Sequence, residues 1–320
     1  MNATSYNTTA PIMHPQLLPF ISDSHLSVVL PVVAYWIYSL FYEFLDYCNF
    51  QMLEPYRIHT PEELTKNRVS KCKVMGWVLF QQALQSILAL VLTDGADKIA
   101  VDTSLAVARY HQVIMQAVSL IGLEKTVSMP LIDKLASWAY WYLEPSVRFF
   151  FAMIILDAYQ YWMHRFFHTN KFLYKHLHSV HHRLYVPYAY GALYNHPLEG
   201  FLMDSLGGGL SYWLAGLSVQ SGAIFFAFSS IKTVDDHSGY DFPWNPLQFL
   251  FNNNARYHDI HHQPAGIKMN FSQPFFTIWD RMFGTYAPTL EACREANKRR
   301  KMALKGSGSE DEDSIKEKKQ

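Results

Sequence analysis

The chain has 320 residues, half of them hydrophobic, and its 27 lysines and arginines balance its 27 aspartates and glutamates. A formal net charge of zero disfavours a nucleic-acid-binding protein, in which a basic excess is typical. The three cysteines, Cys48, Cys72 and Cys293, are far apart, which excludes a disulfide framework and a thiolate metal site built on close cysteine pairs. The hydrophobic residues gather in long runs, so the sequence predicts an all-α, polytopic helical membrane protein.

Residues 1–25 contain no lysine or arginine, and Asn2 and Asn7 begin glycosylation acceptor patterns. The hydrophobic run at 26–45 is long enough to cross a bilayer. Five cations then follow between positions 57 and 73, and the positive-inside rule places such a loop in the cytosol. We therefore predict a lumenal segment at 1–25, a span at 26–45 and a return span at 74–92, which ends near a polar turn at 93–97.

Residues 26–145 are predicted to form membrane spans and interfacial helices. The stretch 105–123 is amphipathic, and the aromatic stretch 138–142 suits the headgroup interface. The next apolar segment, 147–162, leads directly into a histidine-rich region. A spanning helix that continues into water would carry those histidines to the membrane face, where a catalytic domain at 146–288 is predicted to begin.

Eleven of the fifteen histidines lie between positions 164 and 262, and ten of them, all except His176, are candidate ligands. His-X3-His occurs once and His-X2-His-His occurs twice, and such gaps place rings on one helical face. Adjacent histidines point roughly 100° apart around a helix, so each pair suits two different ions. The pattern predicts a dinuclear metal site with these candidate ligands: His164, His168, His178, His181, His182, His196, His237, His258, His261 and His262.

Imidazole binds iron, zinc, copper and nickel, so the ligand type does not name the metal. Two neighbouring metals bound by nitrogen fit oxygen activation better than a closed structural zinc site, and iron is predicted on that ground. Metal-bound imidazoles usually donate their second ring N–H to an acceptor. Four acids near the histidines are candidates for this role, although solvated side chains are an equally common outcome: Asp157, Glu199, Asp236 and Asp259.

The apolar stretch 201–231 separates the histidines at 164–196 from those at 237–262. If all ten meet at one site, the chain between them crosses the membrane an even number of times. Thirty-one residues are too many for one span and too few for two full spans of roughly 20 residues each. We therefore predict a short helical hairpin or a re-entrant pair, which the glycines at 207–209, 216 and 222 permit.

Residues 289–320 are predicted to form a disordered, charged cytosolic tail, because a basic cluster is followed by a Gly-Ser repeat and an acidic run. Lys316 and Lys318 stand five and three residues from the end, as in dilysine retrieval signals of the endoplasmic reticulum. Such signals are read in the cytosol. The tail therefore agrees with a cytosol-facing metal site in the membrane of that organelle.

The histidine set resembles that of the fatty acid hydroxylase superfamily over about residues 140–288. The segments 178–200 and 237–243 are similar to those of its sphingolipid C4-hydroxylases. This resemblance implies two iron ions, O2, and electrons from NADH or NADPH through cytochrome b5 and its reductase. It implies hydroxylation of a long-chain base or ceramide, sphinganine or dihydroceramide, at C4 to give phytosphingosine-type lipids. Some members carry a histidine pair where this chain has only His237, and His196 is expected to supply the missing ligand.

Three other functions compete with this interpretation. A sterol methyl oxidase or desaturase of the same superfamily uses nearly the same histidines, and only product analysis separates it from a hydroxylase. A histidine-rich metal transporter is disfavoured, because transporters place ligands within their spans, whereas these histidines flank the apolar runs. A zinc protease is disfavoured because the sequence contains no His-Glu-X-X-His.

Overall fold

The computed structural model of the chain describes residues 16–93 and 102–302. These residues are helical or irregular, with one isolated bridge between Arg57 and Tyr240, which confirms the predicted all-α class. The α-helices, in chain order, are α1 Asp23–Cys48, α2 Lys71–Thr93, α3 Thr103–Leu120, α4 Met129–Trp138, α5 Glu144–Thr169, α6 Lys171–His176, α7 Pro197–Gly200, α8 Gly207–Ala215, α9 Val219–Asp236, α10 Pro246–Leu250, α11 Ala255–His262 and α12 Ile278–Phe283.

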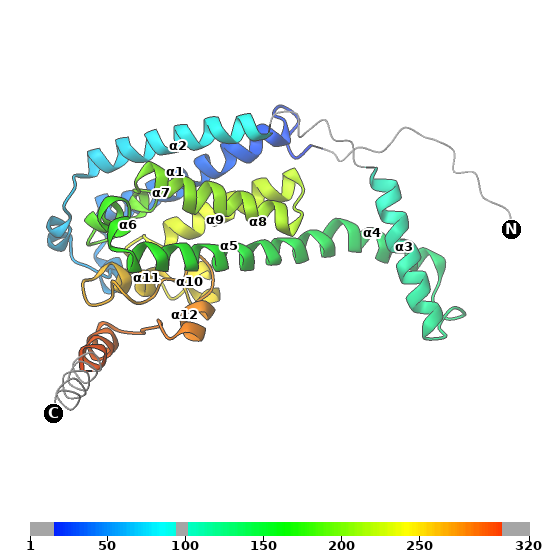
Figure 1. Cartoon of the computed structure of the whole chain (residues 1–320). Coiled ribbons are helices and arrows are strands. Elements are labelled where there is room, and N and C mark those ends of the chain that lie inside the picture. The colour runs from blue at the N-terminus through cyan, green and yellow to red at the C-terminus, as the bar shows by residue number, and fades with distance from the viewer. Residues whose placement is uncertain (1–15, 94–101, 303–320) are drawn as a thin grey trace, which may run out of the picture.

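Shorter elements complete the described fold. The 3-10 segments are η1 Gln51–Tyr56, η2 Pro61–Lys66, η5 His178–Arg183 and η6 Ala189–Gly191, and the π-helical segments are η4 Ala139–Leu143 and η7 Phe201–Leu206. The long helices α1, α2, α5 and α9 run side by side, with α1 packed on α9 and α5 packed on α8 (Figure 1). Short elements, among them α6, α7 and α11, gather at the end of the bundle where α5 and α9 finish, and α3 and α4 extend from the opposite end (Figure 1).

Helices α1 and α2 are the membrane-spanning candidates of the described chain. They have 26 and 23 residues and a hydropathy of 1.6 each, and roughly 20 apolar residues suffice to cross a bilayer. Their outer faces carry exposed large apolar side chains, for example Ile37 at 67% and Val91 at 70% exposure. Such faces are stable against lipid and costly in water. Both predicted spans are therefore present as helices, and they indicate a membrane protein.

Helix α5 differs from the span predicted at 147–162. Among the described helices, only α1 and α2 are long and apolar enough to cross a membrane. Polar side chains interrupt α5: Arg148 binds Glu144, and buried Asp157 accepts hydrogen bonds from the amides of Phe275 and Phe276 at 2.9 and 2.6 Å. One side of α5 therefore packs against protein. Elsewhere on the helix, the side chains of Phe150 and Phe151 are exposed.

Residues 201–231 form the predicted hairpin. Helix α8 leads away from the histidine-rich end, and α9 returns to it. The turn between them ends α8 at Gly216, whose φ of 63° lies in the left-handed region that favours glycine. Arg148 closes this turn by donating to the carbonyl oxygens of Ala215 and Gly216 at 3.2 and 2.8 Å. Whether the hairpin crosses the bilayer stays a prediction.

Several predicted features lie outside the described residues. These are Asn2 and Asn7 in the N-terminal segment, the turn after Thr93, and the acidic run and lysines near the C-terminus. The described part of the predicted tail is helical from 290 to 302. Its start is buried against the catalytic region through Cys293, which packs with Ile260 and Met269. The first residues after 288 are therefore part of the fold.

Candidate metal centre

Nine of the ten predicted histidines form two neighbouring clusters. The first cluster contains His164, His168, His178, His182 and His261, and the second contains His181, His237, His258 and His262. Within each cluster the ligand nitrogens all lie within 4.8 Å of one another. The clusters adjoin, since the rings of His182 and His262 are 4.9 Å apart between centroids. Eight of the nine side chains are buried, and His182 is partly exposed.

Helix geometry assembles the first cluster. His164 and His168 are one turn apart on α5, and their ring centroids are 4.9 Å apart. Asn170 then ends α5 and caps α6, because its side chain accepts from the amides two and three residues later. The short α6 turns the chain back into η5, where His178 lies with its Nε2 3.1 Å from the Nε2 of His164.

Each His-X2-His-His unit divides its rings between the two clusters. His178 and His182 join the first cluster, and His181 between them joins the second. In α11 the division is reversed: His258 and His262 join the second cluster, and His261 joins the first. Adjacent histidines thus serve different clusters, as the helical geometry predicts. The two units interlock, so neither cluster can form without both.

The hydrogen bonds of the rings fix which nitrogen faces inward. A carbonyl oxygen can only accept, so a ring nitrogen bonded to one carries the proton and leaves the other nitrogen as a bare lone pair. Five rings donate Nδ1–H in this way, to main-chain oxygens of residues that no spacing pattern singles out: His164 to Phe271 at 2.8 Å, His181 to Tyr194 at 3.3 Å, His237 to Thr233 at 2.9 Å, His261 to Met269 at 2.7 Å and His262 to Leu184 at 2.8 Å.

The inward-facing ring nitrogens are arranged to bind a metal and cannot all be satisfied by hydrogen bonds to one another. The Nε2 of His258 lies 3.0 Å from that of His237 and 3.1 Å from that of His262. His237 and His262 carry their protons on Nδ1 and present lone pairs, so His258 can donate its single ring proton to at most one of them. The buried Nε2 of His261 has no hydrogen-bond partner among the described residues. Converging lone pairs of neutral imidazoles are the donor set of a transition-metal site.

Burial keeps the rings in the state that binds metal. It lowers the pKa of His178 to about 3 and that of His181 to about 4, from an ordinary value of 6.5. Burial likewise lowers the pKa of His261 to about 3. A protonated imidazole has no free lone pair and cannot bind a metal, whereas these side chains are neutral at physiological pH and each keeps one nitrogen free to bind.

The metal-free protein is expected to lose stability as the pH falls below about 6.5. In that range the unfolded chain takes up protons that the buried rings exclude, so unfolding becomes more favourable until the folded pKa values of about 3 to 4 are reached. Glu199 acts in the opposite direction, since burial raises its pKa to about 7. It is one group against several imidazoles, so the net effect of lowering the pH is a loss of stability.

Thermal unfolding of chelator-treated protein between about pH 7 and pH 4 measures this loss of stability. A flat profile would contradict it, and His176→Ala, at an exposed ring, should leave the slope unchanged.

Glu199 is the predicted acid that contacts a clustered ring. Its Oε1 accepts a short hydrogen bond from Nδ1 of His178, and both side chains are 3% exposed. A carboxylate at this position fixes the ring orientation and makes the Nε2 lone pair a stronger metal ligand.

Glu199→Ala is expected to weaken metal binding about 10- to 100-fold, as measured by competition with a chelator. Glu199→Gln keeps an acceptor and should fall in between. Equal loss in both variants would show that the charge, and not the orientation, matters.

The other three predicted acids make different contacts. Asp157 binds the amides after Pro274, as described above. Asp236 pairs with buried Lys232, and Asp259 accepts a hydrogen bond from His59 at 2.7 Å. These acids hold neighbouring segments in place and do not contact the clustered rings in the hydrogen bonds of the described chain. Tyr174, which no sequence pattern singles out, packs on the rings of His168 and His182 at 5.4 and 6.0 Å.

His196 does not join either cluster. It is the N-cap of α7, and its Nδ1 accepts from the amide of Leu198 at 3.2 Å. Pro197 starts that helix, and the capping contact satisfies an amide that the helix leaves unpaired. The expectation that His196 supplies a ligand is therefore not met by the geometry. The ring serves the local helix start, and the first cluster already has five members without it.

An apolar cavity leads to the clusters. Its volume is about 400 Å³, and it lies between α1, α2, α5, α8 and α9. Its lining residues on α9 run from Val219 to Thr233, which is about 20 Å along a helix. A second cavity of about 40 Å³ is lined by His178, His181 and other clustered rings. The two cavities share five lining residues: Gln160, Leu193, Asp204, Thr233 and Pro274.

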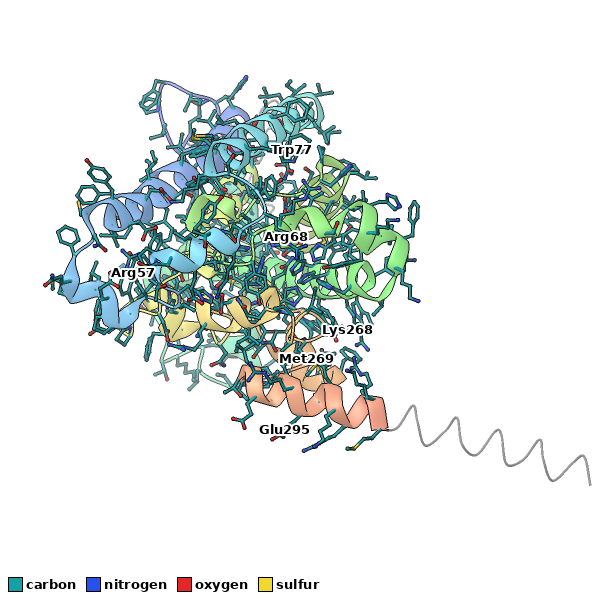
Figure 2. All side chains as sticks on the ribbon, turned by 90° about the vertical axis from the view of Figure 1, so that its left-hand side faces the viewer. Arg57, Arg68, Trp77, Lys268, Met269 and Glu295 are labelled. Carbon is teal, nitrogen blue, oxygen red and sulfur yellow. The ribbon has the colours of Figure 1, made fainter. Side chains whose placement is uncertain are left out.

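The shape suits a long alkyl chain with a reactive carbon at one end. Apolar residues such as Val32, Leu88 and Leu92 line the large cavity, and burying an alkyl chain stabilises its complex by about 0.8 kcal/mol per methylene. The polar junction lies at the histidine end. Figure 2 looks onto that end, where Arg57, Arg68 and Lys268 come from separate segments. Arg68 and Lys268 are exposed.

Known proteins resemble this chain over most of its length. Residues 149–285 match the fatty acid hydroxylase family. The sphingolipid C4-hydroxylase sur2 of Schizosaccharomyces pombe is 48% identical over 82% of this chain and 88% of its own. Sphinganine C4-monooxygenase 1 of Arabidopsis thaliana is 46% identical over 84% of this chain and 89% of its own.

A rice protein named very-long-chain aldehyde decarbonylase GL1-9, from Oryza sativa subsp. indica, is 42% identical over 84% of this chain and 91% of its own. No solved structure matches the chain. The identity to full-length relatives agrees with the histidine clusters and with the matched region. This chain belongs to the fatty acid hydroxylase family.

Proposed function

We propose that this protein is a membrane-bound, O2-dependent di-iron hydroxylase that adds a hydroxyl group at C4 of sphinganine or dihydroceramide, giving phytosphingosine-type lipids. The observation that carries the proposal is the pair of interlocked histidine clusters at the inner end of a long apolar cavity. The similarity to sphingolipid C4-hydroxylases over more than four fifths of the chain supports the choice of substrate.

The nine clustered histidines are the proposed ligands, five for one iron ion and four for the other. When bound, the two ions supply the redox chemistry that splits O2 and breaks an alkyl C–H bond. Neutral imidazoles hold the ions without adding negative charge. The main-chain oxygens that accept from Nδ1 fix the ring orientations, so the site is organised before the substrate enters.

The chain itself positions the substrate and excludes water. The apolar wall of the large cavity takes up the hydrocarbon tail, and the junction residues meet the polar head. A carbon near the head then lies beside His181, His237 and His258, which line the small cavity. This placing selects one position on the chain by distance from the head, because successive methylene groups do not differ chemically.

The membrane arrangement follows from the position of the clusters. We propose that the N-terminus is lumenal, that α1 and α2 cross the endoplasmic reticulum membrane, and that the site and the C-terminus face the cytosol. The cations at 57–73 support this, because Arg57 and Arg68 lie at the histidine end of the bundle (Figure 2) and the positive-inside rule places such loops in the cytosol. Exposed apolar side chains on α5, such as Phe150 and Phe166, agree with partial burial of the bundle in lipid.

Electrons are proposed to come from NADH or NADPH through cytochrome b5 and its reductase. His182 is the partly exposed ring of the two clusters, and Tyr174 packs on it. Exposed cations occur on the same end of the bundle, and Arg68 and Lys268 are two of them (Figure 2). Exposed cations near the clusters favour docking of an acidic electron carrier and speed its association at low salt.

Labelled oxygen tests the reaction and its position together. Membranes that contain the protein, the reductase and iron are incubated with NADH, ¹⁸O2 and, in separate reactions, sphinganine, dihydroceramide, a 4-methylsterol and a very-long-chain aldehyde. Mass spectrometry is expected to find one labelled oxygen at C4 of a sphingoid product. The aldehyde is included because of the rice relative. Oxidation of the sterol, or loss of the aldehyde carbonyl, without a sphingoid product would overturn the proposed substrate. The proposed metal site would be unaffected by that result.

A further inference from the structure

Asp204 has an unusual place at the meeting point of the two cavities. It lies in η7, the π-helical segment Phe201–Leu206 that connects α7 to α8. It is the single carboxylate among the residues that line the large cavity, and it also lines the small cavity beside the histidines. π-Helical turns are rare and occur frequently at functional sites, because they reposition a side chain that a regular helix would direct elsewhere.

The carboxylate of Asp204 has no cation within the described protein. No lysine or arginine lines either cavity, and the buried oxygen Oδ2 has no hydrogen-bond partner in the described residues. The side-chain amide of Gln85 donates a hydrogen bond to the carboxylate, and the nearby negative charge of Glu199 repels it. An unpaired carboxylate in an apolar cavity is costly, so natural sites pair it with a positive charge.

The other two acids of the small cavity each have a nitrogen partner. Glu199 accepts from His178 through Oε1, although its Oε2 has no hydrogen-bond partner among the described residues, and Asp236 pairs with Lys232. Asp204 is the one of the three that also lines the large cavity and has neither a lysine nor a histidine partner among the described residues. A ligand that satisfies it carries a cationic group close to the carbon that meets the histidines, and an apolar tail that fills the large cavity.

Sphinganine has this arrangement. Its amine is on C2, three bonds from C4, and it is protonated at neutral pH, whereas the nitrogen of dihydroceramide is a neutral amide with a second acyl chain. We propose that the carboxylate of Asp204 binds the ammonium group of a free long-chain base and so selects the free base over its N-acylated form. This inference rests on the proposed C4-hydroxylase function, and it names the substrate that the function leaves open.

The distinguishing variant is Asp204→Asn, which keeps the shape and removes the charge. The substrates are sphinganine and N-acetylsphinganine, which share the chain and both hydroxyl groups and differ in the charge of the nitrogen. Wild-type protein is expected to prefer sphinganine. The variant is expected to raise KM for sphinganine about tenfold to a hundredfold, with a small change in kcat and no loss with N-acetylsphinganine. Asp133→Asn, at a carboxylate 70% exposed on α4, is the matched control and should behave as wild type.

Several results would overturn the proposal. Equal losses with both substrates would assign Asp204 a structural role or a bond to a shared hydroxyl group. An unchanged KM for sphinganine in Asp204→Asn would show that Asp204 does not bind the ammonium group of the substrate. A preference of the wild type for N-acetylsphinganine would exclude the selection of free base.

A binding measurement separates this proposal from the proposed reaction. Sphinganine is added to wild type and Asp204→Asn without O2 or reductant, and its effect on the thermal unfolding temperature is recorded. A stabilising shift in the wild type that is lost in the variant supports the Asp204 site even if no C4 product forms in the labelled-oxygen assay. C4 product with equal shifts in both proteins would retain the reaction and overturn the role of Asp204.

Discussion

Replacing His181 or His261 by alanine is expected to abolish hydroxylation and to remove bound metal. The two rings belong to different clusters, and each is buried among other clustered rings, so neither water nor a neighbouring side chain can replace the lost nitrogen in the same place. The loss of either ion stops a reaction that needs both. Product formation and metal content of purified protein are measured together, with circular dichroism to check that the helices remain.

His196→Ala is the matched control for these two variants. It removes a histidine from the same sequence region, but the ring caps α7 and lies outside both clusters. It is expected to keep its metal and its activity, with a loss of about 1 kcal/mol in stability from the missing cap. Metal loss in His196→Ala would return this residue to the ligand set, and normal turnover in His181→Ala or His261→Ala would remove that residue from it.

Asp280→Ala is expected to be the most destabilising single substitution outside the ligands. The carboxylate is fully buried and accepts from the amides of Phe271 and Ser272 at 3.0 and 2.6 Å. It also accepts from the hydroxyl groups of Tyr257 and Thr285. Alanine would leave three buried donors without an acceptor, since only the Thr285 hydroxyl keeps another neighbour, the Tyr161 hydroxyl at 3.2 Å, and this loss costs roughly 3–5 kcal/mol.

The consequence of Asp280→Ala reaches the first cluster. The segment that Asp280 holds supplies the carbonyl of Phe271, which accepts from Nδ1 of His164. The variant should therefore unfold at a lower temperature and bind metal more weakly. Thermal unfolding in detergent measures the first effect and chelator competition the second. Asp241→Ala, at a carboxylate that forms an exposed ion pair with Arg256, should change stability by less than about 1 kcal/mol. Similar behaviour of the two variants would contradict the role of Asp280.

The histidine spacing carried most of the information about the site. In η5 and α11 a three-residue gap is followed by an adjacent pair, and local helical geometry alone then sends neighbouring rings to different clusters. The hairpin at 201–231 followed from length and from the need to bring His237 back to the histidine end. Helices α1 and α2 followed from apolar run length. These features depend on short-range geometry or on composition, which a sequence displays directly.

Other features depend on contacts between distant segments. Main-chain oxygens, such as those of Phe271 and Leu184, accept from clustered rings, and no side-chain pattern identifies such acceptors. His196 resembles a ligand by residue type, yet a following proline makes it a helix cap. Asp204 lies at the junction of the two cavities because the π-helical segment η7 places it there, next to Gln85 of α2. Helix α5 has an apolar run, but Asp157 on it binds amides more than a hundred residues later.

The most direct test of the two-cluster account is the metal content of the purified protein. The protein is produced with ⁵⁷Fe and examined by elemental analysis and Mössbauer spectroscopy, with His181→Ala and His261→Ala beside it. Two iron ions per folded chain, coupled to one another in the wild type and uncoupled or absent in the variants, are predicted. A single ion per chain, or two ions that remain coupled in both variants, would contradict a dinuclear site shared by the interlocked histidines.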